Sequence, residues 1–91
     1  MTRDWFVYVA KCSDKTLYTG VTTDIERRLK EHNSSTLGAK YTKARRPIIF
    51  IHTEAYSDRS LAQKREAVIK RLSREQKLLW LKTCKKHEIE P

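Results

Sequence analysis

Five side chains along the sequence carry groups that can bind phosphate, move a proton or hold a metal ion. They are the phenols of Tyr8 and Tyr18, the guanidinium of Arg28, the imidazole of His32 and the carboxylate of Glu66. A guanidinium can form two parallel hydrogen bonds to a phosphate, and an imidazole can donate or accept a proton near neutral pH. Whether these groups act together depends on the elements that position them.

A β-hairpin is predicted near the start of the chain. Trp5–Lys11 (WFVYVAK) is rich in aromatic and β-branched residues, as is typical of a strand, and Thr16–Val21 (TLYTGV) predicts a second strand. The turn Ser13–Lys15 is short enough for the two strands to pair in antiparallel fashion. Tyr8 and Tyr18 are therefore expected on adjacent strands.

The register of this hairpin is expected to place the two tyrosine rings on one face. With a three-residue turn, Tyr8 pairs with Gly20 and Ala10 pairs with Tyr18, so the rings are diagonal neighbours. Gly20 has no side chain, which would leave room for the Tyr8 ring. An aromatic pair that only packs is the alternative, and spacing alone leaves both interpretations open.

The segment after the hairpin is predicted to form the first helix. Thr23 and Glu26 have the spacing of a capping box. Arg28 and His32 are four residues apart, so they lie one above the other beside the apolar stripe of the helix. A solvated, charged helix face is the alternative. Arg27, about 100° away around the helix, is expected to be solvated.

Glu66 is predicted to border the buried side of a second helix. That helix is capped by Ser57–Asp58 and extends to about Leu72. A carboxylate at the core edge, near cations such as Lys64 and Arg65, is either an ion-pair partner or a metal ligand. One glutamate is sufficient for Mg²⁺, which takes one or two protein carboxylates and completes its shell with water and phosphate oxygens.

The sequence is strongly basic, with 20 Lys and Arg against 11 Asp and Glu and a formal charge of +9. This excess favours a polyanionic partner, because cations that bind phosphates release condensed counterions. Ser34–Arg46 has no hydrophobic period and predicts a basic loop with a short turn of helix. Its mixture of cations, ring and hydroxyl suits phosphate contact and base stacking, and a solvated loop is the alternative. The predicted nucleic-acid-binding residues are Lys40, Tyr41, Lys43, Arg45 and Arg46.

The remaining elements complete an α+β fold. Pro47–Glu54 predicts a third strand that is apolar on both faces in its first half, which favours a central or well-covered position. Ser73 and Gln76 have the spacing of another capping box and begin a third helix. His52 is predicted to be a hydrogen-bonded histidine of the core or rim. The order β-β-α-β-α-α predicts a small three-stranded, largely antiparallel sheet flanked by helices.

The length of 91 residues predicts a single domain, with a core over residues 4–84 and a frayed tail over residues 85–91. Cys12 and Cys84 are far apart and lack a CxxC pattern, so they are expected to be reduced thiols of a cytoplasmic protein. The longest uncharged apolar run, Pro47–Ile51, is much shorter than the ~20 residues that span a bilayer. Neither a membrane partner nor a signal peptide is expected.

These residues together resemble the GIY-YIG nuclease superfamily over nearly the whole chain. Phe6-Val7-Tyr8 stands where the family has GIY, and Tyr18-Thr19-Gly20 stands where it has YIG. Arg28 follows ten residues after the second tyrosine, His32 follows one helical turn later, and Glu66 lies on the next long helix. The phrases LYTGVTTDIERRLKEHN, GAKYTKARRP and EAVIKRLSREQK resemble most closely the short stand-alone bacterial members, the YhbQ-like proteins. Two positions depart from the motif: Phe6 replaces the first glycine, which could narrow the site, and Thr19 replaces the isoleucine.

The resemblance implies a metal-dependent endonuclease that hydrolyses phosphodiester bonds in DNA, with branched, damaged or single-stranded DNA as substrate. In this interpretation Glu66 holds one Mg²⁺ or Mn²⁺, and Arg28 stabilises the charge that develops on phosphorus. Tyr18 takes a proton from the attacking water, while Tyr8 and His32 orient the water and the leaving group. In the alternative assignment, Tyr8 contacts the phosphate and His32 is the base.

Two non-catalytic functions also fit the residues. A nucleic-acid-binding protein would use the basic segment without cleavage, and a protein-interaction module of a repair complex would use the tyrosines structurally. Members of the superfamily usually join this module to a separate DNA-binding domain. Affinity for DNA is therefore expected to come from the basic surface of this chain or from a protein partner, and no small-molecule cofactor is implied.

Overall fold

The computed structural model describes residues 4–34, 36–84 and 89. Within these residues the chain forms three strands and four helices. In chain order they are β1 (Trp5–Lys11), β2 (Leu17–Thr22), α1 (Ile25–Ser34), α2 (Lys40–Lys43), β3 (Ile49–Tyr56), α3 (Arg59–Arg71) and α4 (Arg74–Thr83). The predicted α+β order is confirmed, and α2 is the short turn of helix expected in the basic segment.

The strands form an antiparallel sheet in the order β2-β1-β3, so β1 lies in the centre. The hairpin has the predicted register, with Tyr8 opposite Gly20 and Ala10 opposite Tyr18. This register gives the sheet two faces because side chains alternate along each strand. Successive residues of β1 and β2 therefore contribute to different cores.

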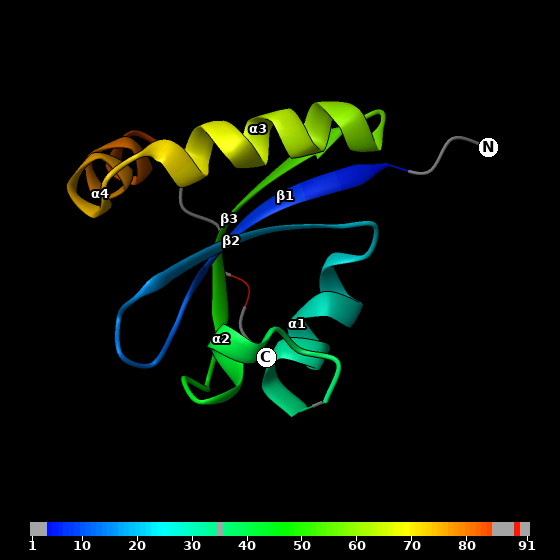
Figure 1. Ribbon diagram of the computed structural model, residues 1–91, viewed down its shortest axis with the longest axis vertical. Coiled ribbons are helices and arrows are strands. Elements are labelled where there is room, and N and C mark those ends of the chain that lie inside the picture. The colour runs from blue at the N-terminus through cyan, green and yellow to red at the C-terminus, as the bar shows by residue number, and fades with distance from the viewer. Residues whose placement is uncertain (1–3, 35, 85–88, 90–91) are drawn as a thin grey trace.

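The two faces of the sheet are covered by different helices (Figure 1). On the first, here called the α1 face, Tyr8 packs in a core cluster with Leu29 of α1. On the second, the α3 face, Val9 packs with Ala62 and Ile69 of α3. Figure 1 shows α3 above the sheet, α1 and α2 below it, and α4 beyond the end of α3. The candidate site residues of the hairpin and α1 lie on the α1 face.

The second strand begins one residue later than predicted and ends one residue later. Thr16 belongs to the turn, because the Asp14 carboxylate accepts hydrogen bonds from its N–H at 3.1 Å and from its hydroxyl at 2.6 Å. Lys15, in the same turn, has a left-handed backbone with φ of 68°. These local bonds hold the turn and leave the register of the hairpin unchanged.

The sequence predicts that the third strand is central or well covered. β3 lies at an edge of the sheet, but its first half is well covered, so the second of these alternatives is confirmed. Phe50 is fully buried and exchanges two backbone hydrogen bonds with Ile89, at 2.9 and 2.7 Å. The prediction of a frayed tail is therefore wrong at Ile89, which satisfies the backbone groups of the sheet edge. The rest of the predicted tail lies outside the described residues.

Asp24 caps α1, so the capping box predicted for Thr23 and Glu26 is wrong. The Asp24 carboxylate accepts a hydrogen bond from the Arg27 N–H at 3.0 Å. The Thr22 hydroxyl oxygen accepts from the Asp24 N–H at 3.1 Å and fixes the residue before the helix. Two adjacent cap-forming residues compete here, and the one that β2 anchors prevails.

The starts of α3 and α4 match the sequence. The Asp58 carboxylate accepts from the Leu61 N–H at 2.8 Å and caps α3. Ser73 and Gln76 form the predicted capping box, with both reciprocal hydrogen bonds present. These two caps define a sharp corner between α3 and α4, so α4 leaves the line of α3 (Figure 1).

Two further predictions concern the cysteines and the membrane. Cys12 and Cys84 are free thiols, as expected. In the part of the chain that the structure describes, the helices are too short and too polar to cross a bilayer.

Candidate active site

Tyr8 is buried on the α1 face, and its position depends on Gly20. A Cβ atom at Gly20 would lie 2.5 Å from the Tyr8 hydroxyl oxygen, so only glycine fits opposite this ring. Phe50 stacks on the ring with centroids 4.3 Å apart. The Tyr18 ring is the predicted diagonal neighbour, 6.3 Å away between centroids. The hairpin thus holds both phenols against α1.

A chain of hydrogen bonds fixes the protonation of His32. The Thr42 hydroxyl donates to the Ala39 carbonyl at 2.9 Å, so it must accept from the Nδ1–H of His32, 2.8 Å away. The Nε2 atom of the neutral ring is then an acceptor, and the Tyr8 hydroxyl donates to it at 2.7 Å. Each proton in this chain has one defined position.

Burial shifts the titration of both partners of this contact. Burial raises the pKa of Tyr8 to about 12, against the hydrogen bond and charge of Arg28, which lower it. Burial also lowers the pKa of His32 to about 4, and the charge of Arg28 adds to this effect. Both side chains are therefore uncharged at neutral pH. The Tyr8–His32 contact is a neutral hydrogen bond, not an ion pair.

Arg28 lies beside the Tyr8 phenol, on the helix face that the sequence predicts. Its Nη1 donates to the Glu31 carboxylate at 3.0 Å and to the Leu37 carbonyl at 2.9 Å. Burial lowers the pKa of Arg28, but hydrogen bonds to Tyr8 and Glu31 outweigh burial, so the pKa is raised and the charge is retained. The Arg28 side chain is 21% exposed against 52% for Arg27, the solvated neighbour that was expected.

Glu66 lies at the margin of the same site. Its partly buried carboxylate pairs with Lys70, one helical turn along α3, at 3.2 Å. The ion-pair partner is thus neither Lys64 nor Arg65, the cations next to it in the sequence. The charge of Glu66 raises the pKa of Tyr8, so the carboxylate acts electrostatically on the phenol. Four predicted residues are in contact, and Glu66 joins them through its charge.

Tyr18 connects this site to the basic segment. Its ring lies edge-on to His32, with centroids 5.6 Å apart, and stacks on Tyr41 at 6.0 Å. The Arg45 guanidinium lies 4.0 Å from the centre of the Tyr41 ring and is held there by Asp14 at 3.0 Å. These contacts form a ladder of two rings and a guanidinium at the border of the site.

The remaining cations of the basic segment have different surroundings. Lys40 and Lys43, on α2, are exposed. Arg46 is partly buried, and its Nε donates to the His32 carbonyl at 2.6 Å, so it binds the C-terminal end of α1. Lys40, Lys43 and the Tyr41–Arg45 pair are thus the part of the predicted nucleic-acid-binding set that faces solvent most directly.

Thr42 and Phe50 are site residues that the sequence did not single out. Thr42 is buried and holds His32, and Phe50 forms one wall of the Tyr8 pocket. Only the mixture of a hydroxyl and a ring in the basic segment was noted as a signal. A four-residue helix has no period from which the inward direction of Thr42 could be read.

His52 lies in a different polar cluster, on the α3 face. Its Nε2 is 2.7 Å from the Glu54 carboxylate, which also accepts from the Tyr56 hydroxyl at 2.6 Å and from Arg65 at 2.8 Å. The prediction of a hydrogen-bonded histidine is confirmed. Among the described residues, no group of three or more His, Cys, Asp or Glu side chains could enclose a metal ion.

Known proteins resemble this chain over most of its length. The family model described as the GIY-YIG catalytic domain matches residues 4–79. A UPF0213 protein of Desulfotalea psychrophila is 52% identical over 82 residues, which cover 90% of this chain and 74% of that protein. One of Syntrophus aciditrophicus is 56% identical over 77 residues, covering 85% and 88%. The solution NMR structure of a protein from E. faecalis, 51% identical, has a TM-score of 0.60 and covers 88% of this chain and 84% of that one.

The chain therefore belongs to the GIY-YIG family, and the matched region contains all five predicted site residues. Its similarity to the UPF0213 proteins confirms the resemblance to the short members of that family.

Proposed function

We propose that the chain is a metal-dependent nuclease that hydrolyses phosphodiester bonds in DNA. The observation that carries this proposal is the convergence of Tyr8, Tyr18, Arg28 and His32, with the charge of Glu66 acting on the same phenol. A charged guanidinium beside two phenols suits a phosphodiester, which carries a negative charge and must receive a nucleophile. The formal charge of +9 supports a polyanionic substrate.

Arg28 is the residue that binds the scissile phosphate. Its guanidinium is oriented by Glu31 and Leu37, so little side-chain freedom remains to be lost when the phosphate binds. The pKa of Arg28 is raised, so the positive charge is present throughout the useful pH range. In the transition state this charge stabilises the negative charge that develops on the phosphate oxygens.

Tyr18 is the group that accepts the proton of the attacking water. His32 is a poor base, because its pKa is about 4 and its Nε2 already accepts from Tyr8. Tyr8 is buried, with a pKa of about 12, and serves to position the site. Tyr18 is only partly buried and lies at the border of the site. It is thus the phenol that is open to a water molecule.

Glu66 is the residue that would hold Mg²⁺ or Mn²⁺. A site with a single carboxylate suits Mg²⁺ only when water and substrate phosphate supply the other ligands, and the described residues offer no larger acidic group nearby. When bound, the ion would neutralise charge on the phosphate and on the leaving oxygen. Lys70, the present partner of Glu66, would have to release the carboxylate.

The ladder of Tyr18, Tyr41 and Arg45 is the border over which the substrate strand would pass. Aromatic rings stack on bases without sequence preference, and nearby cations bind the backbone. The exposed Lys40 and Lys43 extend this basic surface. The surface favours a substrate with unpaired bases, such as a single-stranded or branched DNA.

A pair of neighbouring arginines tests the proposal. Purified protein is incubated with single-stranded and branched DNA in Mg²⁺ or Mn²⁺, and initial cleavage rates are measured. Arg28→Ala should lower the rate about 10²–10³-fold, as loss of a transition-state donor does. Arg27→Ala removes the same charge one residue away. Because the Arg27 side chain is 52% exposed, this variant should change the cleavage rate about two-fold or less.

A second pair of variants tests the metal ligand. Glu66→Gln should abolish the Mg²⁺-dependent cleavage, whereas Glu75→Gln, a change at an exposed glutamate of α4, should leave it unchanged. If wild type cleaves no faster than Arg28→Ala or Glu66→Gln, the nuclease proposal is wrong. Salt-dependent DNA binding without cleavage would then identify a binding protein that uses the basic segment.

A further inference from the structure

A hollow between α4 and the β1–β2 hairpin has the features of a second binding site. Its volume is about 390 Å³, which is in the size range of ligand clefts. It is lined by Lys11 and Leu17, which alternate along their strands with Ala10 and Tyr18. The hollow therefore belongs to the α3 face, on the other side of the sheet from Tyr8 and Tyr18.

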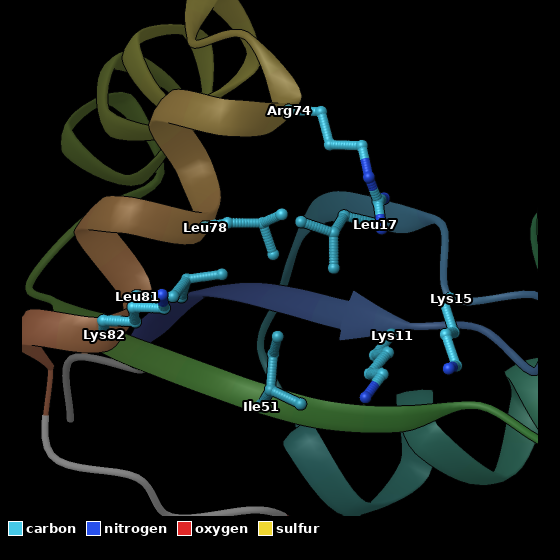
Figure 2. Close-up of a pocket in the computed structure, with 8 residues that line it drawn as sticks. All are labelled: Lys11, Lys15, Leu17, Ile51, Arg74, Leu78, Leu81 and Lys82. Carbon is cyan, nitrogen blue, oxygen red and sulfur yellow. The ribbon is translucent and has the colours of Figure 1, made fainter.

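The floor of the hollow is aliphatic (Figure 2). It consists of Leu17 of β2, Ile51 of β3, and Leu78 and Leu81 of α4, whose side chains converge in Figure 2. Leu17, Ile51 and Leu81 also pack against the α3-face core. The hollow is thus an open extension of the core, formed where α3 has ended and α4 turns away.

The sequence of α4 leaves apolar side chains without a place in the core. Leu78, Leu79, Trp80 and Leu81 are consecutive, so they point in four directions around the helix. Trp80 and Leu81 pack against the sheet, whereas Leu78 is 40% exposed and Leu79 is 58% exposed. Leu78 and Leu81 share one face of the helix, the face towards the hollow.

The rim of the hollow is positively charged. Lys11 and Lys15 of the hairpin and Arg74 and Lys82 of α4 line it, and there is no carboxylate among its lining residues. Arg74 and Lys82 lie one helical turn on either side of Leu78, so α4 presents a cation, a leucine and a cation in a row. Such a surface is complementary to apolar side chains flanked by carboxylates.

We propose that this hollow binds an acidic amphipathic segment of a partner protein. Apolar side chains of the segment enter the leucine floor, and its carboxylates pair with the lysines and arginine of the rim. A peptide suits this hollow better than a nucleic acid strand does. Bases stack on aromatic rings, and no aromatic residue lines the hollow. The smaller hollow of about 220 Å³, which includes Tyr41, has such a ring.

The test uses a synthetic helical peptide of about four turns with leucines on one face and glutamates on the other. A scrambled peptide of equal composition and a thymidine oligonucleotide are the comparison ligands. Binding to the full chain is followed by methyl NMR of Leu17, Ile51, Leu78 and Leu81. We expect saturable shifts at these methyls with the amphipathic peptide and binding at least about 10-fold weaker for the scrambled one.

Variants of adjacent leucines locate the site. Leu78→Lys should weaken peptide binding about 10-fold or more, because it removes an apolar side chain from the floor. Leu79→Lys, the same change at the more exposed neighbour, should leave binding within about two-fold, and both variants should keep a dispersed spectrum. Lys82→Glu should also weaken binding, whereas Lys64→Glu, an exposed lysine of α3, should not.

Three results would overturn the proposal. The first is equal binding of the amphipathic and scrambled peptides. The second is an amphipathic peptide that leaves the hollow methyls unshifted. The third is an oligonucleotide that shifts them at lower concentration than the peptide does, which would make the hollow a nucleic acid site. None of these results depends on nuclease activity, because peptide binding is measured directly and the varied residues are not among those assigned to cleavage.

Discussion

The two faces of the sheet each carry a histidine, an arginine and tyrosine hydroxyls, but they use these groups differently. On the α3 face, Glu54 lies at the centre and accepts from His52, Tyr56 and Arg65. Burial raises the pKa of Glu54, but these hydrogen bonds outweigh it and lower the pKa to about 2. Every donor is directed at one carboxylate, so this cluster has little capacity left for a ligand.

The α1 face has no carboxylate at its centre. Tyr8 donates a hydrogen bond to His32, and His32 donates one to Thr42, so these side chains form a neutral chain of hydrogen bonds. Arg28 keeps a full positive charge beside them. Glu66 contributes its charge from the margin. The same residue types therefore form an ion cluster around one carboxylate on one face and a neutral hydrogen-bonded pair beside a charged arginine on the other. What distinguishes them is where the negative charge lies.

The two faces should differ most in how DNA cleavage and stability respond when one tyrosine hydroxyl is removed from each face. Under the proposed function, Tyr18→Phe should lower DNA cleavage by about 10³-fold, because the proton acceptor is lost. Its stability should stay within about 0.5 kcal/mol of wild type. Tyr56→Phe should leave cleavage unchanged but lower the free energy of unfolding by about 1–2 kcal/mol, since it loses a bond to a carboxylate. Initial rates and urea denaturation measure both.

Equal loss of activity in Tyr18→Phe and Tyr56→Phe would contradict this division of roles. It would mean that both faces act through stability alone.

Much of the α1 face could be predicted from the sequence, because alternation in a short hairpin fixes it. Tyr8, Tyr18 and Gly20 follow from strand period and turn length, and Arg28 and His32 from helical spacing. These are local rules that need no knowledge of the rest of the chain.

The errors arose where distant or competing contacts decide the outcome. Ile89, far along the chain, covers the apolar edge of β3 and so does not fray as predicted. Asp24 replaces Thr23 as the helix cap because β2 anchors it. Thr42 has no local pattern at all, and its role depends on three elements meeting. The partner of Glu66 is a different case, because Lys70 is four residues away on α3, a spacing that the local helical rule covers.

Acid should affect the α1 face first, through His32. The pKa of His32 is about 4 in the folded chain against its ordinary value of 6.5, so the unfolded chain binds this proton more readily. The contribution of neutral His32 to the free energy of unfolding is fully present above pH 6.5. It falls by roughly 3 kcal/mol as the pH is lowered from 6.5 to 4. Urea denaturation across this range measures the loss, and His32→Gln should flatten it. An NMR titration with the His32 pKa above 6 would contradict the assignment.

The α3 face should lose its ion cluster only at lower pH. The pKa of Glu54 is about 2 against 4.5, so its contribution is present above pH 4.5 and is lost as the pH falls towards 2. Glu54→Gln should lower the free energy of unfolding at pH 7 by about 2 kcal/mol, allowing for partial exposure. The difference from wild type should shrink below pH 4.5. A difference that stays constant with pH would show that packing, rather than charge, stabilises this cluster.

The smallest effects are expected from two buried threonines, one on each face. Thr42→Val should lower the free energy of unfolding by about 1.5 kcal/mol, because it leaves the buried Nδ1–H of His32 without an acceptor. On the α3 face, the Thr19 hydroxyl is buried without a partner among the described residues. Thr19→Val should therefore raise the free energy of unfolding by about 1 kcal/mol, because it removes an unsatisfied hydroxyl at nearly constant volume.

The same Thr→Val substitution is therefore expected to change the free energy of unfolding in opposite directions at the two positions. The sign depends on whether the buried hydroxyl has a hydrogen-bond partner. Thr42→Ser, which keeps the hydroxyl, should restore most of the stability and the His32 tautomer, which the ¹⁵N shifts of the ring report. A stable Thr42→Val protein with the same tautomer would break the inferred order of protons from Tyr8 to Ala39. Loss of stability in Thr19→Val would instead mean that its hydroxyl is bonded, to water or to one of the residues outside those described. The two faces would then resemble each other more closely than their side-chain contacts indicate.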